Sequence, residues 1–101
     1  MKSLLTEFCW MQSSLHVQIN LALAFRLLHD YVAWSRQHHR RLPLRQTLVA
    51  CCVYFLLRRA HVEILADLCQ RYHIPFAQID SITKRFEKIF LVHQKIREGG
   101  P

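Results

Sequence analysis

Ten consecutive apolar residues, LVACCVYFLL, occupy positions 48–57. As a helix this segment would be about 15 Å long, half of the roughly 30 Å that the core of a bilayer requires. We therefore expect no membrane-spanning helix here. A helix that is apolar on every face is instead surrounded by other helices. The segment thus predicts a buried central helix in an all-α fold.

Apolar residues at helical spacing predict four more helices around this one. We place them at residues 4–11, 14–36, 62–72 and 76–97, and we extend the central helix to residues 44–59. Residues 15–25 also alternate as a half-buried strand would, but no other segment could pair with such a strand. We prefer a helix with Ser13 or Ser14 as its N-cap. The prediction is a compact bundle of about five helices in one domain, residues 1–98, with a frayed tail at 99–101.

The last two predicted helices are joined by a tight break at Tyr72-His73-Ile74-Pro75, as in a helix-turn-helix. Pro75 disfavours a helical residue before it, and histidine is among the residues that tolerate the positive φ this turn needs at His73. The outward face of the second helix would carry Phe76, Ala77, Asp80, Ser81 and Lys84. That face lacks the Arg, Asn or Gln that contacts bases in pairs of hydrogen bonds, and Gln78 lies off it. We therefore expect these two helices to form a packing arrangement and not to recognise a DNA sequence.

Residues 44–90, about half of the chain, resemble a cyclin box, especially the repeats of general transcription factor IIB. In such a box an arginine precedes an Ala-rich, Tyr-containing helix, followed by a short helix, a turn with an aliphatic residue and a last helix. The residues in matching places are Arg45, Ala50, Cys51, Tyr54, Leu68, Ile74, Ile79 and Ile82. The sixth subunit of the origin recognition complex has a similar box, and helix-turn-helix heads of transposases and regulators have a similar last pair of helices. The resemblance implies an accessory factor in transcription, replication or transposition.

Positive charge is concentrated in the middle of the chain. Residues 36–59 hold six arginines, two histidines and no acidic residue, whereas the remainder holds eight basic and seven acidic residues. Six of the seven net positive charges therefore lie in this stretch. Arginine can hold a phosphate through two hydrogen bonds. Such an excess suits nucleic acid or an acidic protein surface.

These features predict a small, basic nucleic-acid-associated factor that binds mainly through phosphates and largely without regard to sequence. The alternative is a protein interaction module or inhibitor that docks an acidic partner through the same arginines and exposed aromatic residues. The predicted nucleic-acid contacts are Arg36, His38, His39, Arg40, Arg41, Arg45, Arg58 and Arg59, with Lys84, Arg85 and Lys88 as lesser helpers. The predicted protein-interface residues are Trp10, Trp34 and Phe76.

The four cysteines suit buried free thiols, since Cys51 and Cys52 are adjacent in an apolar run, and this favours an intracellular location, in the cytoplasm or a nucleus. Cys69 and His73 are four residues apart, but no second pair at ligand spacing supports a metal site. No Ser/His/acid pattern or glycine-rich phosphate loop is present, and we expect no enzyme, metal or cofactor. An apolar fraction of 51% exceeds what one small core hides, which predicts a homodimer or a complex with a larger protein.

Overall fold

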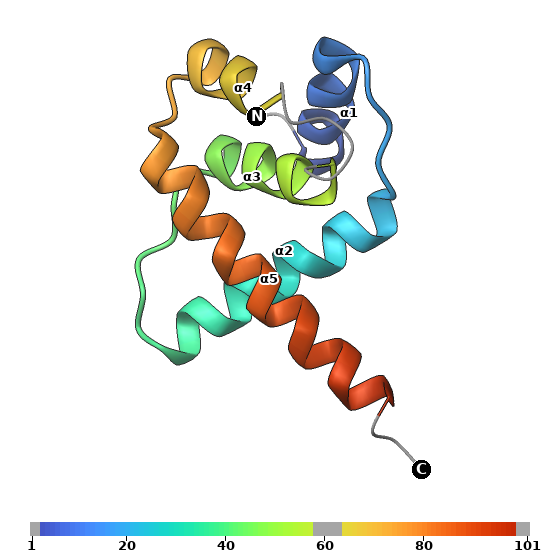
Figure 1. Ribbon diagram of the computed structural model, residues 1–101, viewed down its shortest axis with the longest axis vertical. Helices are drawn as coiled ribbons and strands as arrows, with labels where there is room; N and C mark the ends of the chain where they lie inside the picture. The colour runs from blue at the N-terminus through green and yellow to red at the C-terminus, as the bar shows by residue number, and fades with distance from the viewer. Residues whose placement is uncertain (1–2, 58–63, 99–101) are drawn as a thin grey trace.

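The computed structural model describes residues 3–57 and 64–98, and within these ranges it contains five α-helices and no strand (Figure 1). The helices are α1 (Leu4–Leu15), α2 (Leu21–Gln37), α3 (Arg45–Leu57), α4 (Ile64–Tyr72) and α5 (Phe76–Glu98). The predicted all-α bundle is confirmed. The predicted tail at 99–101, the first two residues of the predicted helix 62–72, and Arg58 and Arg59 lie outside the described residues.

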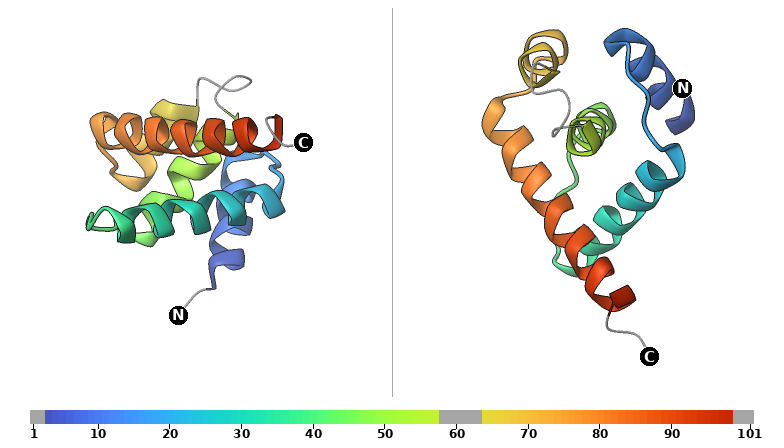
Figure 2. Two further views of the ribbon diagram at one scale, coloured as in Figure 1. Left: turned by 90° about the horizontal axis from the view of Figure 1, so that it is seen from below. Right: turned by 45° about the vertical axis from the view of Figure 1, so that its right-hand side comes forward.

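Helix α3 is the centre of the bundle. It packs against each of the other four helices, and the right-hand view of Figure 2 shows it end-on between them. Every residue from Thr47 to Val53 is buried, which confirms the predicted central helix over most of the apolar run. The last turn, 54–57, is only partly buried. There Phe55 packs its ring against Phe86 and Phe90 of α5, at centroid distances of 5.9 and 6.1 Å.

Two small thiols let α2 and α3 approach closely. Cys51 and Cys52 are buried, and Sγ of Cys52 donates to the backbone carbonyl of Ala24 on α2 over 3.7 Å. Burial raises the pKa of both thiols to about 12, and the neighbouring Cys69 adds to the rise at Cys51. Both groups therefore stay neutral and act as small apolar residues of the core.

The boundary between α1 and α2 differs from the prediction. Ser13 and Ser14 are not N-caps, because α1 continues through them to Leu15. Helix α2 begins at Leu21, where the Asn20 side-chain oxygen accepts a hydrogen bond from the Leu23 amide over 3.1 Å. The alternating pattern in this region marks a non-helical link, in which Val17 and Ile19 pack on the core while the residues around them are exposed. The Asn20 cap satisfies a free amide at the start of α2 that a serine six or seven residues earlier, inside α1, could not reach.

Three helix ends carry histidine in the left-handed conformation that glycine usually takes. His16 after α1, His39 after α2 and His73 after α4 have φ of 55°, 52° and 55°. The predicted positive φ at His73 is thus confirmed. Pro75 follows, and its carbonyl accepts hydrogen bonds from the amides of Gln78 and Ile79 as α5 begins. This short turn brings Ile74 and Ile79 into the core.

Candidate nucleic-acid interface

The link from α2 to α3, residues 38–44, is named the basic connector here, and hydrogen bonds fix its first half. The backbone amide of His38 donates to the Trp34 carbonyl over 3.1 Å, and the Arg40 amide donates to the Ser35 carbonyl over 2.8 Å. His39, at positive φ, turns the chain between them. These bonds satisfy carbonyls in the last turn of α2 and set the direction in which the connector leaves the helix.

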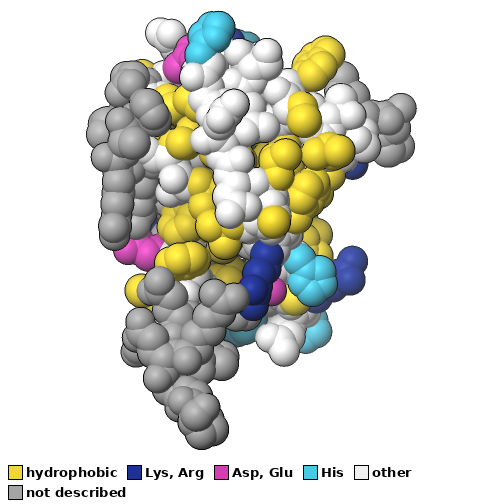
Figure 3. Space-filling view, turned by 90° about the vertical axis from the view of Figure 1, so that its right-hand side faces the viewer, with side chains coloured by type: hydrophobic (Ala, Val, Ile, Leu, Met, Phe, Trp, Pro, Cys, Tyr) yellow, Lys and Arg dark blue, Asp and Glu magenta, His cyan; other side chains and the backbone are white. Residues whose placement is uncertain are grey.

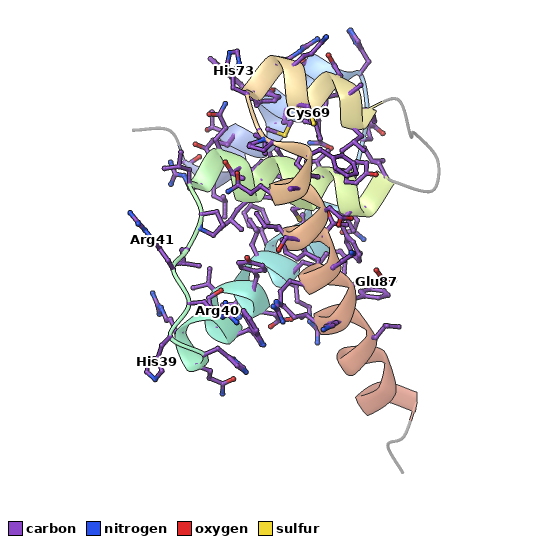
Figure 4. The ribbon with its side chains drawn as sticks, turned by 60° about the vertical axis from the view of Figure 1, so that its left-hand side comes forward. His39, Arg40, Arg41, Cys69, His73 and Glu87 are labelled. Carbon is purple, nitrogen blue, oxygen red and sulfur yellow. The ribbon has the colours of Figure 1, made fainter. Side chains whose placement is uncertain are left out.

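Three arginines at the end of α2 and in the basic connector expose their side chains to solvent. Arg36, Arg40 and Arg41 are exposed, and within residues 3–57 and 64–91 no carboxylate forms an ion pair with any of them. Figure 4 shows His39, Arg40 and Arg41 along the connector at the edge of the molecule. A guanidinium without an internal partner keeps its hydrogen-bond donors for an external anion.

Two other cations that were predicted to contact nucleic acid, Arg45 and Lys84, form ion pairs with carboxylates of the chain. Nε of Arg45 lies 3.2 Å from Oε2 of Glu7, an ion pair without hydrogen-bond alignment that joins the start of α3 to α1. Nζ of Lys84 lies 3.1 Å from Oδ2 of Asp80, one turn earlier on α5. The structure thus distinguishes Arg36, Arg40 and Arg41, which have no carboxylate partner among the described side chains, from Arg45 and Lys84, which each have one. The predicted second patch at Arg58 and Arg59 lies outside the described residues.

Trp34 connects the end of α2 to α5. Its ring stacks with that of His38 at 4.4 Å and 20°, and Cζ of Arg85 lies 3.7 Å from the centroid of its ring. A guanidinium over an indole is held by the quadrupole of the ring. Arg85 also lies near Tyr31, whose pKa is raised by burial and lowered in part by this charge. Trp34, one of the predicted interface residues, is only partly exposed between α2 and α5, and its part in a protein interface stays a prediction.

A groove of about 440 Å³ lies beside this tryptophan and is lined by residues of both α2 and α5. Figure 1 shows these two helices crossing. Residues at helical spacing on each helix form its walls. They are Asp30, Ala33, Trp34 and Gln37 from α2, and Arg85, Lys88 and Ile89 from α5. Arg85 and Lys88 were predicted as lesser helpers in binding, but the groove was not predicted, because no local sequence pattern signals the crossing of α2 and α5.

The other two predicted interface residues are exposed. Trp10 on α1 has 61% of its surface accessible and Phe76 at the start of α5 has 59%. Trp10 borders a second hollow of about 380 Å³, whose walls include Tyr72 of α4 and Val49 of α3. Figure 3 shows apolar side chains gathered in a band on the side of the molecule that carries α1 and the link to α2. An exposed tryptophan such as Trp10 is a frequent anchor for a protein partner.

The start of α5 offers little for reading bases. Phe76, Ala77 and Ser81 are exposed as predicted, while the Asp80 carboxylate is partly buried and paired with Lys84. Gln78, which the predicted register placed off this face, is also exposed and is the one amide side chain of this turn. The ring of Phe76 has no hydrogen-bonding group for a base edge, and the Asp80 carboxylate, which could only accept a hydrogen bond, as from cytosine N4, is paired with Lys84.

Cys69 and His73 do not converge on a metal. Figure 4 shows Cys69 on the side of α4 that faces α3, whereas His73 projects at the top of the molecule. Among residues whose side chains the structure describes, no three His, Cys, Asp or Glu side chains are grouped as metal ligands would be. Within the same part of the chain, no helix has both the length and the apolar character needed to cross a membrane.

Comparison of the chain with protein-family models, with curated proteins and with solved structures gave no match in any of the three. The resemblance of residues 44–90 to a cyclin box, or to a helix-turn-helix head, therefore stays a prediction from the sequence.

Proposed function

We propose that this chain binds nucleic acid through phosphate contacts made by Arg36 and the basic connector, without reading base sequence. The observation that carries the proposal is the group of three exposed arginines, Arg36, Arg40 and Arg41, which have no carboxylate partner in the described part of the chain. Three arginines within six residues can follow successive phosphates, and such contacts position a protein on its target without identifying bases.

Independence from sequence follows from the start of α5. Asp80 there would repel phosphates, and its pairing with Lys84 leaves that turn without net positive charge. A recognition helix needs several side chains that reach base edges, as Arg, Asn and Gln do, and the first turn of α5 presents Gln78 alone of these types. We assign the α4–α5 pair to packing, and we place the chain among accessory factors of transcription, replication or transposition on the strength of the sequence resemblance.

A second candidate function is docking to an acidic protein surface. Trp10 and Phe76, both more than half exposed, favour it, because aromatic anchors supply much of the affinity at protein interfaces. The same arginines would then face carboxylates at the rim of the interface, where ion pairs change association rates more than affinity.

The salt dependence of binding separates these two functions. With three phosphate contacts, the logarithm of affinity for duplex DNA should fall against the logarithm of salt with a slope of about −3, from about 0.9 per phosphate. Fluorescence anisotropy with a labelled duplex at several salt concentrations measures this slope. A slope near zero, or no binding to DNA or RNA at low salt, would reject the proposal and favour the protein-docking alternative.

A further inference from the structure

The groove between α2 and α5 combines apolar walls with two cations, a combination suited to an unpaired nucleotide. Its apolar surface comes from Ala33, Trp34 and Ile89, and its cations are Arg85 and Lys88. Its volume of about 440 Å³ lies within the range of about 300–1,000 Å³ typical of small-ligand sites. A single base with its sugar fits that range, whereas a stacked base pair presents only edges to such a groove.

His38 adds a flat surface at the end of α2, next to Trp34 and Gln37 of the groove. Its ring lies on the indole of Trp34 with an interplanar angle of 20°, and its Nδ1 is 2.9 Å from the Trp34 carbonyl oxygen. Because a carbonyl oxygen only accepts hydrogen bonds, Nδ1 carries the proton of this bond. One face of the imidazole is therefore fixed on the indole, and since His38 is exposed, its accessible surface lies on the other face and the outer edge.

The charges around the groove suit a phosphate at its rim. Lys88 is exposed, and no carboxylate among the described side chains pairs with it. Arg85 is held 3.7 Å from the indole centroid, so its guanidinium is in place before a ligand arrives. Asp30 also borders the groove, and its Oδ1 lies 3.6 Å from Nδ1 of His29. The amide of Gln37, which is exposed at the end of α2, offers hydrogen bonds to a base edge or a sugar hydroxyl.

We infer that the chain prefers single-stranded over duplex nucleic acid, with one base entering the α2–α5 groove, a neighbouring base stacked on His38, and the intervening phosphate on Lys88. This inference rests on the proposed function and names its substrate class. Proteins that bind single strands without sequence preference combine aromatic side chains with a line of cations. The cations contact the phosphates, and the aromatic side chains stack on the bases, each of which has a flat face. Arg36 lies in the last turn of α2 and would contact the phosphate that leads to the basic connector.

The test uses Trp34 as its own reporter. Trp10→Phe removes the other tryptophan of the chain, so that emission comes from Trp34 alone. This protein is titrated with a labelled single strand of about twelve nucleotides and with a duplex of the same length, by anisotropy and by tryptophan fluorescence. We expect the single strand to bind about tenfold more tightly and to quench Trp34, while the duplex leaves the emission unchanged.

Two variants with a matched control locate the site. Lys88→Gln and His38→Ala should each lower affinity for the single strand about five- to tenfold and leave duplex affinity nearly unchanged. Lys84→Gln removes the same charge one turn away on α5, from a lysine paired with Asp80, and should change single-strand affinity by less than about twofold. Equal affinity for single strand and duplex, with no quenching of Trp34, would reject the binding of a base in the α2–α5 groove but would leave the proposed function intact. Absence of binding to either would overturn the proposed function itself.

Discussion

Histidine takes the place of glycine at three helix ends of this protein. His16, His39 and His73 all have φ near 50°, and the only two glycines of the chain stand at positions 99 and 100. A residue with a Cβ in this conformation costs on the order of 1 kcal/mol relative to glycine. The prediction of positive φ at His73 succeeded because Pro75 and the apolar residues on either side locate the turn. His16 and His39 lack such a marker and were missed.

The cost at His73 can be measured by substitution. His73→Gly should raise the free energy of unfolding by about 0.5–1 kcal/mol, because glycine adopts this conformation without strain. His29→Gly is the matched control, since His29 is exposed in the interior of α2 and glycine there should lower the free energy by about 1 kcal/mol. Urea unfolding gives both values. A loss of stability in both variants would show that His73 carries no strain.

Among the elements, those with an unambiguous apolar pattern were predicted and the boundary between α1 and α2 was not. The central helix and α5 followed from the run at 48–57 and from the break at Pro75. The first boundary could not be found because Ser13, Ser14 and Asn20 are all good N-caps, and the choice depends on how Val17 and Ile19 pack on the core. That packing involves residues of other helices and cannot be predicted from the local sequence.

The cap of α2 gives a test of this boundary. Asn20→Ala should lower the free energy of unfolding by about 1 kcal/mol, because the Leu23 amide loses its hydrogen-bond acceptor. Ser13→Ala should leave stability unchanged or raise it by a few tenths of a kcal/mol, because Ser13 lies exposed inside α1 and alanine favours a helix. Thermal or urea unfolding compares the two. An equal loss of stability in both variants would indicate that the helix begins at Ser13 or Ser14, as the sequence predicted.

For the molecule as a whole, the positive charge of the candidate site was predicted from the sequence, but the contacts that shape the site were not. The run of arginines is visible in the sequence, and the pairing of Lys84 with Asp80 follows from their spacing on one helix. The pairing of Arg45 with Glu7 and the contact of Arg85 with Trp34 join residues far apart in the chain. Only the packing of α1 on α3 and of α2 on α5 brings them together.

The exposed apolar surface supports the proposal of a homodimer or a complex with a larger protein. Among the side chains that the structure describes, six large apolar ones are exposed, namely Leu5, Trp10, Leu42, Leu44, Phe76 and Leu91. We expect light scattering at high concentration to give a mass about twice the 12.1 kDa of one chain, and Trp10→Ser to lower it. A mass of 12.1 kDa at every concentration would contradict self-association and leave a larger partner as the remaining form of the proposal.

Removal of two arginines from the basic connector tests the proposed binding mode most directly. Arg40→Ala combined with Arg41→Ala should weaken binding to all nucleic-acid sequences alike and flatten the salt slope by about two units. Arg26→Ala is the control, because Arg26 is exposed on α2 about 15 Å along the helix from Arg36. Asp80→Ala with Ser81→Ala should leave affinity unchanged or slightly higher, as a repulsive charge is removed. If that second pair instead abolishes binding to one preferred sequence while the arginine pair has no effect, α5 reads DNA and the basic connector is not the site.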